Sequence, residues 1–232
     1  MAGRSGSASA LAEVLVRIEV AHLVSSSSMV SRAYLVDNCL GVVVDAGESG
    51  YWLASALTSL APDPDGLRVR AAEKGRIPVE HGTPRLVKIT LGWGESSVEF
   101  RNPVVVSGPG VGVVSLAVPA SFSEKVRTGA GPKPVSLAGD IDLALGDEVA
   151  VAVLSDGQPL VRWARVSSDA GFGGVAGGLA LDVGVPADMA GAPVFHLSEA
   201  EARFCGLAVP LDAATSVLLP TMAIVEAMPS AL

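Results

Sequence analysis

Short apolar runs, most of them rich in valine, make up this sequence of 232 residues, and glycine or proline interrupts them at close intervals. Residues 14–20, Val-Leu-Val-Arg-Ile-Glu-Val, alternate apolar and polar side chains as a strand with one buried face does. Such runs predict strands at 14–20, 41–45, 51–54, 67–71, 85–91, 97–100, 104–106, 111–118, 148–154, 160–167, 179–182, 193–197 and 204–209. Only residues 7–14 and 213–227 are typical of helices. Many short strands at this spacing indicate an all-β barrel or sandwich.

A change in composition divides the chain into two strand-rich halves. Residues 120–134 break the strand rhythm with Ser, Glu, Lys, Arg, Thr and the run Gly-Ala-Gly-Pro-Lys-Pro. We therefore expect one unit at 12–119, a linker at 120–134 and a second unit at 135–232. The net charge of −8 is uneven: residues 1–119 carry 10 Lys and Arg against 11 Asp and Glu, whereas residues 120–232 carry 6 against 13. The acidic character belongs to the second half.

The composition excludes several classes of protein. Half of the residues are apolar and only 17% are charged, which excludes an intrinsically disordered chain. An acidic surface repels phosphate, so we expect no nucleic-acid partner. Two cysteines cannot make a disulfide scaffold.

The mean hydropathy of +0.49 raises the question of a membrane. The longest uncharged run, 102–123, contains several prolines and glycines, whereas a spanning helix needs about 20 continuous apolar residues. Charged residues at 13, 17 and 19 also interrupt any signal-peptide core near the N-terminus. We expect a soluble, cytoplasmic protein with no membrane partner.

Four segments of the second half carry a family pattern, in order and with matching spacing. Residues 145–153 (Leu-Gly-Asp-Glu-Val-Ala-Val-Ala-Val) and 160–167 resemble the first two strands of the second barrel of HtrA/Deg-type trypsin-like serine proteases. Residues 181–195, Leu-Asp-Val-Gly-Val-Pro-Ala-Asp-Met-Ala-Gly-Ala-Pro-Val-Phe, resemble that family's segment around the nucleophile. Residues 204–210, followed by a helix, resemble its closing strand.

The first half resembles the same family through shorter segments. Residues 41–47 and 51–57 resemble the pair of strands that precedes the family's histidine, and 111–118 resemble the strand that begins with its aspartate. The resemblance implies a chymotrypsin fold: two six-stranded antiparallel β-barrels with a C-terminal helix. Because HtrA-like proteins commonly form trimers, it is also compatible with a homo-oligomer.

The resemblance places the family's catalytic triad on residues that cannot perform its chemistry. The histidine position is Leu57, the aspartate position is Gly112 and the serine position is Ala190. None of these side chains has a lone pair, an acidic proton or a charge. The oxyanion loop corresponds to Asp188, Met189 and Gly191, and a carboxylate at 188 would oppose a developing negative charge. Three separate losses favour natural degeneration over one engineered substitution.

No other cluster offers a strong catalytic or cofactor site. The three histidines, His22, His81 and His196, are expected in surface or loop positions, although His196 lies near Asp188 and Ser198 in the sequence. The glycine-rich run 171–178 lacks the Lys-Ser/Thr of a phosphate-binding loop.

Two further groups of residues are equally unremarkable as sites. The acidic residues Asp140, Asp142, Asp147 and Glu148 do not complete a calcium-binding loop. Cys39 and Cys205 are expected to be buried free thiols in different barrels. We expect no metal and no cofactor.

Three functions remain open at this point. The leading hypothesis is a pseudoprotease: a catalytically inactive homologue that binds a protein or peptide, preferably a basic one, or acts as a scaffold. The second is an active trypsin-like endopeptidase with a non-standard or misaligned site. The third is a purely structural or oligomerising domain.

Overall fold

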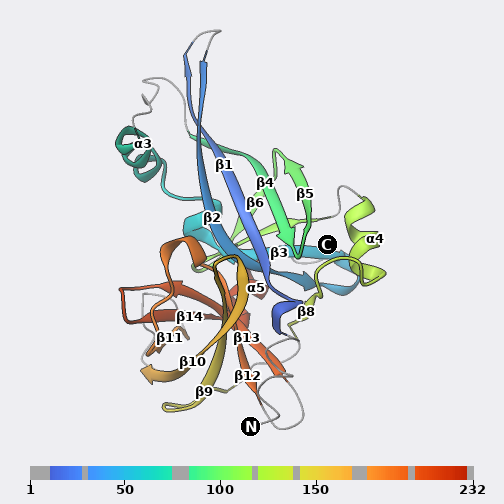
Figure 1. Ribbon diagram of the computed structural model, residues 1–232, viewed down its shortest axis with the longest axis vertical. Helices are drawn as coiled ribbons and strands as arrows, with labels where there is room; N and C mark the ends of the chain where they lie inside the picture. Colours follow the sequence, from blue (N-terminus) through green and yellow to red (C-terminus); the bar gives the residue numbers. More distant parts are fainter. Residues whose placement is uncertain are drawn as a thin grey trace.

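The computed structural model describes residues 11–27, 31–74, 84–116, 120–137, 142–168, 177–197 and 202–228. Their strands form two β units stacked one on the other (Figure 1). The expected all-β architecture of two barrel-like units with a helix after the final strand is confirmed. Among the described residues, no helix has the length and apolar character needed to span a bilayer.

The first unit is an eight-stranded sheet with the order β5-β4-β1-β2-β3-β7-β6, and β8 pairs in parallel with β2. Its strands are β1 (Val16–Ser27), β2 (Ser31–Asp45), β3 (Tyr51–Ala56), β4 (Arg85–Trp93), β5 (Ser96–Arg101), β6 (Val105–Ser107), β7 (Val111–Ser115) and β8 (Val135–Ser136). Within the described residues, β5 and β6 are its edges, so this unit is a half-barrel rather than a closed six-stranded barrel. A short 3-10 helix, η1 (Gly47–Ser49), lies in the connection between β2 and β3.

The β1–β2 hairpin extends well beyond the body of the half-barrel (Figure 1). The strand predicted at 14–20 overlaps β1 only at residues 16–20, because the strict alternation of apolar and polar residues ends there. Helix α3 (Pro64–Glu73) lies beside the hairpin, and a small apolar cluster joins them: Val24, Leu35, Leu67 and Ala71.

The strand predicted at 67–71 is wrong, because these residues belong to α3. The side chain of Asp63 caps the helix by accepting from the Gly66 N–H at 2.9 Å, and Pro64 occupies the first turn. Both are standard helix-start signals. They outweigh the accidental alternation of Leu-Arg-Val-Arg-Ala.

Helix α4 (Ala120–Arg127) packs against the core of the half-barrel. Phe122 is buried and its ring meets the rings of Trp93 and Phe100 edge-on, each at a centroid distance of 5.6 Å. Residues 120–134 therefore do more than connect the two units, because their first eight residues contribute to the first core.

The second unit is a closed six-stranded antiparallel barrel with the order β10-β11-β14-β13-β12-β9. Its strands are β9 (Glu148–Ser155), β10 (Gln158–Ser168), β11 (Leu179–Leu181), β12 (Ala192–Leu197), β13 (Ala202–Pro210) and β14 (Ser216–Pro220). The helix predicted at 213–227 is too long: it begins only at Thr221, as α5 (Thr221–Ala227), because β14 pairs with both β11 and β13 to close the barrel.

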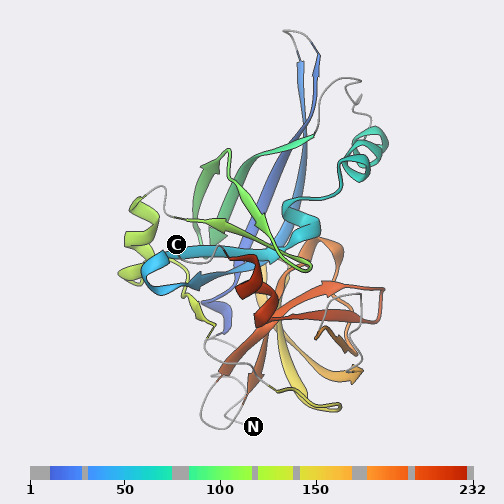
Figure 2. The same ribbon diagram turned by 180° about the vertical axis from the view of Figure 1, so that it is seen from behind.

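Helix α5 packs against both units, which Figure 2 shows from behind. A Cβ on Gly108, next to β6, would lie 2.8 Å from the Ala227 Cβ, so the helix and the half-barrel are in close contact. One buried cluster also contains residues of both units, including Leu40, Ala54 and Val111 of the first and Val194 of the second. The two units thus share a continuous apolar interface.

Candidate functional site

The segment before β12 joins the two units through backbone contacts. The Leu40 N–H of β2 donates to the Ala190 carbonyl at 3.0 Å, and the Gly191 N–H donates to the Ala208 carbonyl at 2.9 Å. Gly191 has a φ of +88°, and a Cβ there would lie 2.2 Å from the Leu40 carbonyl oxygen and 2.6 Å from the Ser55 Oγ. Only glycine fits this position. Ala190 is therefore held directly at the boundary between the units.

Leu57, Gly112 and Ala190 come together around one residue, Ser55. Gly112 faces Ser55 across the β3–β7 ladder. Leu57 begins the short helix α2 (Leu57–Leu60) two residues after Ser55, and its N–H donates to the Gly110 carbonyl at 2.8 Å. The Ser55 Oγ lies against the glycine that follows Ala190. In the sequence, 55 residues separate Leu57 from Gly112 and 78 separate Gly112 from Ala190. In the fold, all three lie around Ser55.

The environment of Gly112 is apolar and crowded. A Cβ on this residue would lie 3.1 Å from both the Leu60 Cδ1 and the Val105 Cγ1. Both contacts are closer than ordinary van der Waals packing, so an aspartate side chain would displace its neighbours and place its charge among methyl groups.

Asp188 and Met189, two of the three residues predicted for the oxyanion loop, lie in a short 3-10 helix, η3 (Ala187–Met189), and Gly191 follows two residues after it. The Met189 N–H donates to the Pro186 carbonyl at 2.9 Å, and the Ala190 N–H donates to the Ala187 carbonyl at 3.3 Å. The side chain of Asp188 is exposed, whereas Met189 is half-buried. An oxyanion hole needs free N–H donors aimed at the reacting oxygen. At position 190 the turn itself uses that donor.

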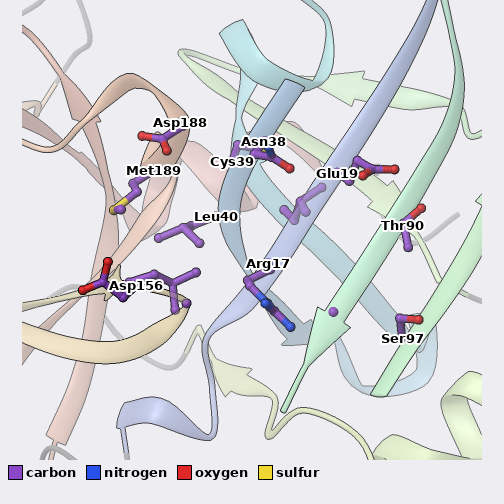
Figure 3. A pocket seen from close by; sticks show the side chains of 14 residues that line it. Arg17, Glu19, Asn38, Cys39, Leu40, Thr90, Ser97, Asp156, Asp188 and Met189 are labelled. Carbon is purple, nitrogen blue, oxygen red and sulfur yellow. The ribbon is translucent and has the colours of Figure 1, made fainter. Parts of the chain in front are cut away.

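A groove lies between the units on this side of the molecule, and we call its larger part the first cavity. It has a volume of about 540 Å³. Figure 3 shows Asp156, Asp188 and Met189 on one wall, with Arg17 and Glu19 of β1 opposite them. Asn38, Cys39 and Leu40 of β2 lie between the two walls, and Thr90 and Ser97 line the far side.

The second cavity, of about 460 Å³, continues the groove toward α3. Asn38 and Asp188 line both cavities, so the two adjoin. Thr58 and Ser59 of α2 and Ala190 also line the second cavity, which places it directly beside the triad positions.

An ion-pair cluster forms the far wall of the second cavity. Arg70 of α3 lies 2.9 Å from the Asp37 carboxylate and Lys74 lies 3.7 Å from it, with Asp37 on β2 largely shielded from solvent. All three residues line this cavity. The cluster carries a net charge of +1 where α3 meets β2.

His22 is buried rather than exposed, which corrects the surface or loop position expected for it. Its Nε2 lies 3.3 Å from the Leu60 carbonyl. Since a carbonyl can only accept, Nε2 carries the proton and Nδ1 is left buried without a partner. Burial lowers the pKa of His22, only partly offset by the Leu60 carbonyl and by Asp37. Among the described residues, no hydroxyl forms a hydrogen bond with its ring nitrogens.

The two cysteines are free and buried in different units. Burial raises the pKa of the Cys39 thiol to about 11, although the Ser55 and Ser59 hydroxyls partly counteract this effect. Burial likewise raises the pKa of Cys205 to about 12. Cys39 lines the first cavity, but a thiol with this pKa is a poor nucleophile near neutral pH.

The remaining sequence candidates contribute little to this site. His196 lies in β12 opposite Arg203, away from both cavities. His81, Ser198, Asp140 and residues 171–176 of the glycine-rich run lie outside the described residues. In the part of the chain that the structure describes, no three His, Cys, Asp or Glu side chains are close enough together to hold a metal ion.

Sequence reasoning missed several residues of this site. Nothing in the sequence distinguishes Ser55, because a single serine in an apolar strand is common. In the structure its Oγ donates to the Leu40 carbonyl at 2.5 Å. Asn38 and the cluster of Asp37, Arg70 and Lys74 depend on a contact between a hairpin and a helix that are distant in the sequence. Recognising the Asp63–Pro64 helix start would have placed Arg70 and Lys74 one turn apart on α3.

Comparison with known proteins identifies the fold. No family model matches the chain, and no curated protein matches it. Among solved structures it is similar to Deg5, with a TM-score of 0.59 and 14% identity, covering 97% of this chain and 91% of that one. It is also similar to the MamO protease domain from Magnetospirillum magneticum in its apo form, with a TM-score of 0.55 and 14% identity, covering 95% and 98%. The protein therefore has the trypsin-like double-barrel fold of HtrA/Deg-type protease domains, as the sequence predicts.

Proposed function

We propose that this protein is a catalytically inactive homologue of trypsin-like serine proteases that binds an extended peptide between its two units. The observation that carries the proposal is the meeting of Leu57, Gly112 and Ala190 around Ser55. A serine protease needs a nucleophile, a base and a group that orients the base. The side chains at these three positions supply none of them.

Two further features of the site support inactivity. The Ala190 N–H donates within its own 3-10 turn, so this amide does not point at a tetrahedral intermediate. The contacts of Leu60 and Val105 at the Gly112 position leave no room for an aspartate without repacking. The oxyanion hole and the aspartate pocket are thus degenerate as well as the triad, which is expected after a long loss of catalysis rather than one recent substitution.

The groove supports the binding half of the proposal. The first and second cavities adjoin at Asn38 and Asp188 and run along the boundary between the units. Main-chain pairing and side-chain pockets can capture an extended peptide without any catalytic group. Asp156 and Asp188 project from the acidic second half of the chain into the groove, which favours basic side chains at that end of a bound peptide.

The test is covalent labelling with a fluorophosphonate, which reacts only with an activated serine. We expect no labelling of the natural chain and none of Ala190→Ser, because that variant gains a hydroxyl but no base. Trypsin serves as the positive control, and casein cleavage is followed in parallel. Stoichiometric labelling of the folded natural chain, lost on denaturation, would refute the proposal.

A further inference from the structure

The two ends of the groove differ in charge, although Asp188 lines both cavities. The first cavity is lined by three carboxylates, those of Glu19, Asp156 and Asp188, against one guanidinium, that of Arg17. Glu19 is already engaged by Lys88, whose Nζ lies 3.7 Å from its carboxylate. Asp156 and Asp188 have no ion-pair partner among the described residues and project from the second unit.

The positive end comes from α3, which packs against the β1–β2 hairpin. Leu67 and Ala71 anchor the helix, while Arg70 in its last turn and Lys74 at its C-terminal end line the second cavity. Asp37 neutralises one of these two charges, so the wall formed by α3 and β2 keeps one positive charge, whereas Asp188 of the second unit adds a negative charge to the same cavity. The side chains of Arg70 and Lys74 are 41% and 54% exposed, so both remain accessible to a ligand.

Backbone geometry gives the distance between the two ends. Asp37, which contacts Arg70, and Leu40, which bonds to Ala190 two residues after Asp188, are three residues apart on β2. At about 3.3 Å per residue, the charged walls are anchored roughly 10 Å apart. An extended peptide covers that distance in about three residues.

We propose that the groove selects a peptide segment of mixed charge, with an acidic side chain at Arg70 and Lys74 and a basic side chain at Asp156 and Asp188, about three residues apart. This inference rests on the proposed function, because it specifies which peptide occupies the same groove. The expected partner is then a peptide with both an acidic and a basic side chain, rather than a uniformly basic peptide. A uniformly basic segment would place like charges beside Arg70 and Lys74, which is unfavourable.

The experiment measures fluorescence anisotropy of labelled eight-residue peptides binding to the full chain. One peptide carries Glu and Lys three residues apart, and its controls carry Gln at either position, Gln at both, or Glu and Lys side by side. An accessible ion pair changes affinity by up to about fivefold. We expect the spaced Glu/Lys peptide to bind roughly tenfold more tightly than the double-Gln peptide, with each single-Gln peptide in between.

Charge reversal on the protein identifies which end binds which side chain. Lys74→Glu should weaken binding of the spaced peptide about tenfold, and a peptide with Lys in place of its Glu should recover the loss. Asp188→Lys should give the mirror-image result with a peptide that carries two Glu residues. Arg127→Glu on α4, outside the groove, is the matched control for net charge and should change affinity less than twofold.

The outcomes separate this inference from the function on which it rests. Equal affinity for the spaced and the double-Gln peptides, or no effect of Lys74→Glu and Asp188→Lys, would overturn the bipolar selection while peptide binding stands. Failure of every peptide to bind would count against both. Rescue by the charge-swapped peptides shows that the variants are folded, so a general loss of structure cannot imitate the expected result.

Discussion

Replacing Gly191 with alanine tests how the two units are joined. The new Cβ would stand 2.2 Å from the Leu40 carbonyl oxygen, 2.6 Å from the Ser55 Oγ and 3.1 Å from the Ala56 nitrogen. Two of these atoms belong to the backbone of the first unit and cannot rotate away. Relief therefore requires the units to separate where the Leu40 N–H donates to the Ala190 carbonyl.

The expected cost has three parts. A non-glycine residue at φ +88° costs about 1–2 kcal/mol. Overpacking costs about 1–3 kcal/mol, and weakening the hydrogen bond between the units about 1 kcal/mol. We expect Gly191→Ala to lower the free energy of unfolding by about 3–6 kcal/mol. Gly47→Ala is the matched control: its φ is +63° but nothing lies within 4 Å of the new Cβ, so only about 1–2 kcal/mol is expected.

Urea unfolding, followed by tryptophan fluorescence and far-ultraviolet circular dichroism, gives both free energies. The tryptophans report on both units, because Trp52 and Trp93 lie in the first and Trp163 in the second. The difference between the two variants isolates the contact between the units from the backbone strain. If Gly191→Ala cost no more than Gly47→Ala, the tight junction described here would be wrong.

Three further predictions concern buried groups. The pKa of His22 in the folded chain lies below its usual value, so the unfolded chain takes up a proton first as the pH falls. The free energy of unfolding should therefore decrease below about pH 6.5. Urea unfolding at pH 7.5 and pH 5.5 should show a smaller decrease for His22→Gln than for the natural chain. Cys39 and Cys205 should react slowly with Ellman's reagent at pH 8 in the folded chain, because both thiols are buried. In urea, both thiols should react rapidly. A fast reaction of either thiol in the folded chain would contradict its burial. Phe122→Ala should cost about 3–5 kcal/mol and reduce the near-ultraviolet circular dichroism of Trp93, whereas an unchanged spectrum would refute the packing of α4.

The alternation of apolar and polar residues predicted the strands wherever buried and exposed side chains alternate along the strand. Val16, Ile18 and Val20 of β1 face the core, as their spacing implies. The errors arose where another interaction outweighed the pattern. Residues 67–71 alternate like a strand, but a capped N-terminus makes them helical. Residues 216–220 are helix-compatible in isolation, yet pairing with two strands makes them part of the barrel.

The site was predictable only as far as the family pattern reaches. Spacing along the chain placed Leu57, Gly112 and Ala190 at corresponding positions, and the fold brings these positions together. The charges in the second cavity were not predictable, because Arg70 and Lys74 reach the groove through the packing of α3 on a distant hairpin. The hydrogen bond that the Ala190 N–H donates to the Ala187 carbonyl was also not predictable, because residue types do not reveal the backbone hydrogen bonds of a turn.

In the proposed function, the groove binds a peptide and leaves it intact. The most direct measurement incubates the full chain for a day with a tenfold excess of the spaced Glu/Lys peptide, isolates the complex by gel filtration and weighs the bound peptide by mass spectrometry. We expect the peptide to co-elute with the chain at its full mass. Recovery of two fragments cut at a single bond, from the natural chain and not from Ser55→Ala or a heat-denatured sample, would contradict it.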